Sequence, residues 1–80
     1  MKTEIGMVQK RKFLIIEITV VINRELSRDE IYELIEAVGE FASRVSILSF
    51  KRIVSDVLSS FGYDYKIVST HFELFSKWFF

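Results

Sequence analysis

Hydrophobic and polar positions divide the chain into segments that predict strands and helices. Residues 12–22, KFLIIEITVVI, are dominated by β-branched and aromatic side chains, which favour a strand. One side of this strand is wholly apolar, and the other is mixed because it includes Glu17 and Thr19. The strand is therefore expected to lie in the centre of a sheet, or to have both of its faces covered. Residues 1–10 show no sustained period, so we expect them to form either a loose N-terminal arm or a short edge strand.

The segment that follows this strand predicts an amphipathic helix. Ser27 and Glu30 have the spacing of a capping box, in which side chains satisfy the free amides at a helix start. Apolar residues then recur every three or four positions from Ile31 to Val45, as expected for one buried helical face. We expect the opposite face to be solvated, with a divalent cation or a basic partner protein as the alternative occupants. That acidic face consists of Asp29, Glu33, Glu36 and Glu40.

A second apolar period, from Ile47 to Phe61, begins soon after the first. It is out of phase with the first by about half a turn, because an α-helix advances roughly 100° per residue. One straight helix cannot bury both faces, so the chain must bend near residues 43–46. Two interpretations are open: a tight turn between two helices, or a short strand over residues 44–50 before a shorter helix. Alternation fails at Leu48 and Ser49, which favours the two helices.

The last part of the chain predicts a strand followed by an aromatic element. Gly62 can supply the left-handed conformation that commonly ends a helix, and residues 65–70, YKIVST, have the composition of a strand. Residues 71–80 can be interpreted as a continuation of this strand. The three- to four-residue spacing of their phenylalanines instead favours a short helix.

These elements predict a single α+β domain over residues 1–80, a two-layer sandwich in which helices cover one face of a sheet. The expected order is β-α-α-β followed by the aromatic C-terminal element. The variant is β-α-β-α-β, if residues 44–50 form a strand. In both cases the second sheet face is exposed to water unless the C-terminal aromatics or another molecule cover it. The pattern leaves open whether those aromatics pack on their own domain or on a partner.

The apolar content is high for so short a chain. Half of the 80 residues are hydrophobic and 15% are aromatic. A domain of this size typically buries only about 60% of the surface that its unfolded chain exposes. We therefore expect a homodimer, or a subunit that binds a partner protein, with an interface formed by an apolar sheet face and the aromatic C-terminus. The residues expected at this interface are Phe13, Ile15, Val21, Phe75, Trp78, Phe79 and Phe80.

Charge gives no overall preference for nucleic acid, because 11 basic residues balance 11 acidic ones. The predicted strand and two helices nevertheless resemble the ribbon-helix-helix repressors, in which the strands of two copies pair and enter the major groove. This resemblance covers residues 13–61 and implies a nucleic-acid-binding dimer as the alternative function. The chain departs from that family in its mixed strand face, which is mostly apolar and includes Glu17. The residues that would contact phosphates are Arg11, Lys12, Arg44, Lys51 and Arg52.

No residue pattern in the sequence indicates catalysis. His71 has only Glu73 near it in the sequence, and the serines lack the G-x-S-x-G and S-x-x-K patterns. The three glycines are too dispersed to hold a phosphate, and the lack of cysteine excludes disulfides and thiolate zinc sites. The longest apolar run, residues 13–22, is half of the about 20 residues that a membrane-spanning helix needs. We expect a cytoplasmic, non-enzymatic protein without a cofactor, a metal ion or a membrane partner.

Overall fold

The computed structural model describes residues 1–74, which form a three-stranded sheet and two α-helices. A single turn of 3-10 helix, η1, leads directly into the second α-helix. The α+β class and the pair of helices between strands agree with the prediction. The elements in chain order are β1 (Thr3–Arg11), β2 (Leu14–Ile22), α1 (Arg28–Ala42), η1 (Ile47–Ser49), α2 (Phe50–Ser60) and β3 (Tyr65–Leu74).

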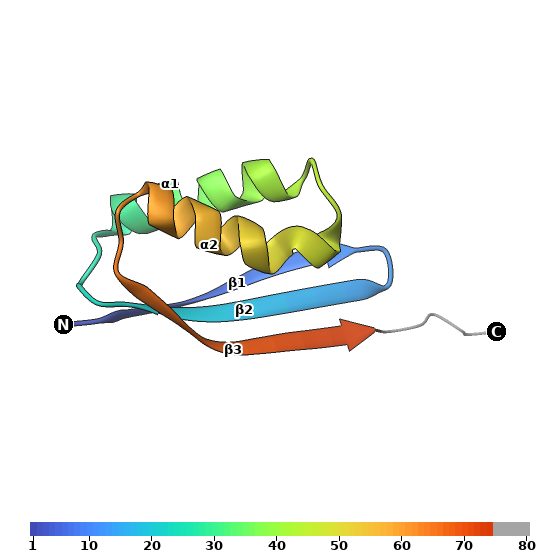
Figure 1. Cartoon of the computed structure of the whole chain (residues 1–80), viewed down its shortest axis with the longest axis horizontal. Coiled ribbons are helices and arrows are strands. Elements are labelled where there is room, and N and C mark those ends of the chain that lie inside the picture. Colours follow the sequence, from blue (N-terminus) through green and yellow to red (C-terminus); the bar gives the residue numbers. More distant parts are fainter. Residues whose placement is uncertain (75–80) are drawn as a thin grey trace.

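The sheet is antiparallel throughout, with the order β1-β2-β3 (Figure 1). β2 is the central strand, as its apolar composition predicts, and it pairs along its whole length on both edges. Leu14 lies opposite Arg11 of β1 and Leu74 of β3. One extra residue of β3 forms a bulge opposite the junction of Thr19 and Val20.

Two parts of the sequence-based prediction change at the ends of the sheet. For residues 1–10 the edge-strand alternative is confirmed and the loose arm is wrong, because Thr3–Arg11 form a nine-residue edge strand against β2. The short helix predicted from His71 is wrong for residues 71–74, which continue β3. Pairing with residues 14–17 gives this segment ladder hydrogen bonds, whereas an isolated helix of that length is unstable. Four residues of the predicted interface lie outside the described residues: Phe75, Trp78, Phe79 and Phe80.

Helix α1 begins at the predicted capping box. The Glu30 amide donates to Ser27 Oγ over 3.2 Å, and the Ser27 amide donates to Glu30 Oε1 over 2.9 Å. Arg24 Nη2 lies 2.7 Å from the second carboxylate oxygen of Glu30. The hydrogen bond from the Ser27 backbone, followed by the one from Arg24, lowers the pKa of the Glu30 carboxyl group. The charged form of Glu30 therefore stabilises the start of α1.

We expect the substitution Glu30→Gln to destabilise the fold in a pH-dependent way. Because the folded pKa of Glu30 is lowered, the stability due to its charge is present above the ordinary carboxyl pKa and disappears as pH falls through the folded pKa. Urea unfolding of both proteins should show wild type as the more stable at pH 7, with the difference shrinking in acid. Glu36→Gln, on the exposed face of α1, is the control. A difference for Glu30→Gln that stayed constant with pH would contradict this account.

The two helices are separated by a turn, and the predicted strand over residues 44–50 is wrong. Ser46 Oγ accepts a hydrogen bond from the Leu48 amide over 3.2 Å, which starts the 3-10 turn, and Ile47 is buried. This turn reorients the chain so that the out-of-phase apolar faces of α1 and α2 both reach the core. Gly62 has φ of 78°, the left-handed conformation that ends α2 as predicted.

Both helices pack on the same face of the sheet (Figure 1), where alternate residues of β2 meet the apolar faces of α1 and α2. α1 packs mainly over β1, and α2 packs mainly over β2. This arrangement positions β3 at the margin of the helical layer. The fully buried side chains from the sheet and helices include Ile18, Val20, Ile22, Leu34, Phe50, Val54 and Leu58.

Candidate assembly surface

Strand β3 forms one edge of the sheet and extends beyond the well-packed part of the core. Near its start, Tyr65 and Ile67 are half-buried and pack against the core. Every residue from Val68 to Leu74 is exposed. In the described part of the chain, β3 has β2 on one side and no strand on the other. Its outer edge therefore presents free backbone donors and acceptors to solvent.

The exposed half of β3 carries three large apolar side chains. Val68 is 49% exposed, Phe72 48% and Leu74 76%. Phe72 lies opposite Ile16 and Leu74 opposite Leu14, so these two residues share the face on which the helices pack. They extend the apolar core layer past the region that α1 and α2 cover. We call residues 68–74 the β3 edge.

The other face of the β3 edge is polar and charged. His71 lies opposite Glu17 of β2, and Glu73 lies opposite Ile15. The imidazole Nε2 of His71 is 3.3 Å from Glu73 Oε1, and both side chains are more than half exposed. The β3 edge therefore alternates apolar residues on the helix side with a histidine and a carboxylate on the open side.

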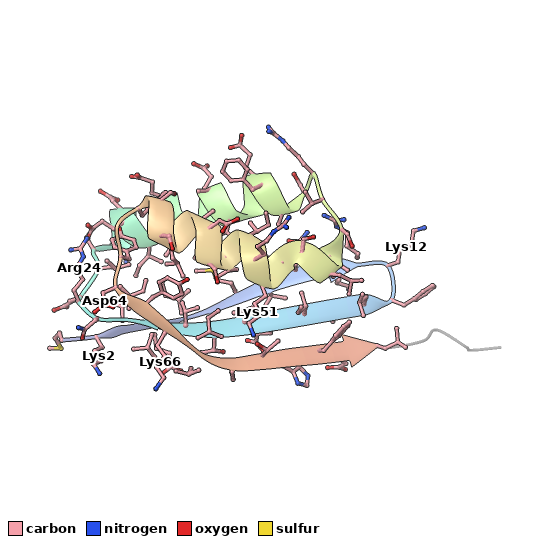
Figure 2. The ribbon with its side chains drawn as sticks, in the orientation of Figure 1. Lys2, Lys12, Arg24, Lys51, Asp64 and Lys66 are labelled. Atoms are coloured by element: carbon pink, nitrogen blue, oxygen red, sulfur yellow. The ribbon has the colours of Figure 1, made fainter. Side chains whose placement is uncertain are left out.

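The described residues of the predicted interface lie on or beside the open sheet face. Phe13, in the turn between β1 and β2, is 49% exposed, whereas Ile15 and Val21 are partly buried. Charged residues interrupt this face, and Figure 2 shows Lys2 and Lys66 projecting from it. The structure brings Phe13 and Ile15 to the end of the sheet where β3 ends, and places Val21 at the opposite end. Neighbours across the strands are Lys10 and Glu73 for Ile15, and Glu4 and Lys66 for Val21.

The other sheet edge, β1, is a poorer surface for pairing. Ile5 and Met7 are buried, and among its large apolar residues only Val8 is highly exposed, at 57%. The strand ends in consecutive cationic residues, Lys10 and Arg11, followed by Lys12 in the turn. Charged side chains at a sheet edge oppose pairing with another strand. We therefore assign the candidate surface to β3.

Two of the basic residues of the nucleic-acid alternative lie near the end of α1, because Arg11 donates to the Ala42 and Val45 carbonyls, on either side of Arg44 in the sequence. Figure 2 shows Lys12 at the β1–β2 turn and Lys51 along α2, well apart on the surface. Arg44 pairs with Glu40 at 3.2 Å. β2 is also paired on both edges, so it has no free edge with which to form the ribbon of the ribbon-helix-helix repressors. The topology differs from that family in this respect.

Arg11 has a structural role that its sequence context does not reveal. Its guanidinium donates to the Ala42 carbonyl over 2.6 Å and to the Val45 carbonyl over 3.1 Å. Ala42 is the last residue of α1 and Val45 lies in the turn that follows, so both carbonyls are near the negative end of the helix dipole, which favours a cation. Arg11 thus ties the end of β1 to the end of α1.

We expect Arg11→Met to lower the free energy of unfolding by about 1–2 kcal/mol, because two charge-assisted hydrogen bonds are lost while the side-chain stem is kept. Urea unfolding at pH 7 measures this loss. Arg11→Lys should restore only part of it, since one ammonium group lacks the forked geometry of the guanidinium. If Arg11→Met were as stable as wild type, the proposed connection would be wrong.

The described residues were expected to include neither a metal site nor a membrane-spanning helix, and their arrangement gives no indication of either. Within residues 1–74, no group of three or more histidine or acidic side chains is placed to hold a metal ion. The carboxylates of the acidic face of α1, Asp29, Glu33, Glu36 and Glu40, are exposed, and Glu40 contacts Arg44. Neither helix in this part of the chain is long and apolar enough to cross a bilayer.

The sequence interpretation missed Val68, Phe72 and Leu74 as surface residues. A signal was present, because Thr70, Phe72 and Leu74 alternate with the polar residues His71 and Glu73. This is the period of a strand with two different faces. The spacing of the later phenylalanines competed with it and favoured a helix.

No family model matches the chain, and no curated protein or solved structure matches it. The candidate surface is therefore defined by the geometry of the β3 edge alone.

Proposed function

We propose that this protein is a non-enzymatic assembly module that forms a homodimer through the outer edge of β3. The observation that supports this function is the β3 edge itself, a strand segment with a free backbone edge and exposed Val68, Phe72 and Leu74. Its action is to join two sheets through backbone hydrogen bonds, with apolar side chains packing across the junction. The lack of enzymatic activity and the cytoplasmic location stay predictions.

Two features of the β3 edge are unfavourable in a monomer, and strand pairing would remove both. Water, rather than a neighbouring strand, must satisfy the outward backbone groups of residues 68–74. The exposed parts of Phe72 and Leu74 also stay in contact with water, although full burial of such a side chain is worth about 1.5–3 kcal/mol. A symmetric dimer covers Phe72 and Leu74 of both copies in one interface, and two-fold dimers are the commonest soluble oligomers.

The proposed interface shares only some residues with the interface that the sequence predicts. Phe13 and Ile15 lie at the end of the sheet where β3 ends, so they would border the dimer junction. Val21 lies at the far end, beside Lys66, and would take no part. The participation of Phe75, Trp78, Phe79 and Phe80 stays a prediction, and the experiment below includes it.

Sedimentation equilibrium over a dilution series tests the proposed function. The mass should approach twice 9.4 kDa at high protein concentration and fall toward 9.4 kDa on dilution. A second preparation without residues 76–80 separates the β3 edge from the C-terminal aromatics, and it should still dimerise. A monomer at every concentration would overturn the proposal. Loss of the dimer on removal of residues 76–80 would assign the interface to those residues instead.

A further inference from the structure

We infer that the two copies pair antiparallel with the two-fold axis at Phe72, so that Phe72 lies opposite the same residue of the partner. This inference rests on the proposed homodimer and specifies its register. The argument comes from the order of side chains in THFEL, residues 70–74, and from the face that each side chain occupies.

The register follows first from the pairing of His71 with Glu73. In an antiparallel pair centred on Phe72, the residues before and after it face each other across the junction. His71 then lies opposite the partner's Glu73, and Glu73 lies opposite the partner's His71. An imidazole N–H can donate a hydrogen bond to a facing carboxylate oxygen, whereas two carboxylates that face each other repel. The β3 edge is therefore complementary to itself in this register.

Neighbouring registers lose this complementarity. A two-fold axis at His71 would place the two imidazoles opposite each other, and Glu73 opposite the partner's Ser69. An axis at Glu73 would bring two carboxylates together, which is unfavourable. An axis between two residues would pair side chains from opposite faces of the sheet, which the pleat does not allow.

The same axis also arranges the apolar side chains favourably. A two-fold axis perpendicular to the sheet keeps the helices of both copies on the same side of the joined sheet. Phe72, Leu74 and their counterparts then lie on that side, between the α2 helices that flank the junction. Thr70 lies opposite the partner's Leu74. The exposed extension of each core layer is thereby covered by the other copy.

Disulfide trapping tests the register, because the natural chain contains no cysteine. The Cα atoms of directly opposed strand residues are about 4.5–5.5 Å apart, within the about 4.4–6.8 Å range that a disulfide spans. Phe72→Cys should therefore form a covalent dimer under mild oxidation. Thr70→Cys alone and Leu74→Cys alone should not, since identical positions two residues from the axis are about 13 Å apart.

A mixed experiment keeps Phe72 in place, in case Phe72→Cys itself weakens the dimer. Thr70→Cys in one copy, combined with Leu74→Cys in a second copy that carries a size tag, should give a covalent dimer of mixed composition. If the mass is dimeric but cross-linking occurs instead at another position, such as His71→Cys, the register is wrong and the proposed homodimer stands. A monomeric mass together with no cross-linking at any position from 68 to 74 would overturn both.

Discussion

Phe50→Ala should lower the free energy of unfolding by about 3–5 kcal/mol, the usual range for removing a buried phenylalanine ring. Phe50 is the first residue of α2 and is 1% exposed. It also lines a partly open pocket of about 120 Å³ between β1 and α1, together with Met7 and Val38. Truncating the ring would enlarge this space, and the rigid strand and helix around it limit collapse. The loss therefore combines the transfer of the ring with the cost of a larger cavity.

Urea unfolding followed by circular dichroism measures this effect, with Phe41→Ala as the matched control. Phe41 is on α1 and is 51% exposed, so its truncation should cost less than about 1 kcal/mol. A small domain has a total stability of about 5–15 kcal/mol, so Phe50→Ala can leave little folded protein. Phe50→Leu then provides a milder variant with a measurable transition. Equal losses at positions 50 and 41 would contradict the assigned core.

The double substitution Phe72→Lys and Leu74→Lys should convert the dimer into a folded monomer. Each dimer would bring four ammonium groups to the junction, where they lose hydration and repel one another. Both residues are exposed in the single chain, so the fold itself should tolerate the change. Lysine at an edge strand is also a common means of preventing strand pairing. Sedimentation should give 9.4 kDa at concentrations where wild type is dimeric.

Leu48→Lys is the control for this variant, because it introduces the same charge at an apolar residue that is 72% exposed in η1, away from β3. The control should keep the dimeric mass. Circular dichroism should confirm that both proteins stay folded. A double variant that remained dimeric, or a control that dissociated to the same extent, would remove β3 from the interface.

The elements that could be predicted from the sequence are those specified by local interactions. The capping box of Ser27 and Glu30 acts within one helical turn, and Gly62 sets the end of α2 through its own backbone conformation. β2 was predictable because its continuous β-branched composition suits only a central strand. The phase difference between the two helical periods was enough to indicate a turn.

The parts that the sequence left open or missed depend on contacts between distant residues. β1 contains Gly6 and a mixture of polar and apolar residues, so the sequence could not decide between an arm and an edge strand, and pairing with β2 makes it a strand. Residues 71–74 become strand through residues 14–17, about 57 positions earlier in the chain. Arg11 contacts carbonyls 31 and 34 residues away. Local periodicity carries no information about these contacts.

The candidate surface could be predicted only in its general nature. The excess of apolar residues predicted an interface, but its position depends on which strand lies at the edge and how far the helices reach. The open sheet face, on or beside which Phe13, Ile15 and Val21 lie, is interrupted by charged residues. At the edge of the sheet, Phe72 and Leu74 instead extend the apolar core layer. Strand order and helix placement decide this difference, and both are properties of the whole fold.

Amide hydrogen exchange along β3 measures edge pairing directly. The outward-facing amides of residues 68–74 have no strand partner within a single described chain, so they should exchange rapidly in dilute solution. We predict that raising the protein concentration slows exchange at these amides and leaves the amides of β2 unchanged. Rapid exchange at the β3 edge at every concentration would contradict the proposal that this strand joins two copies of the protein.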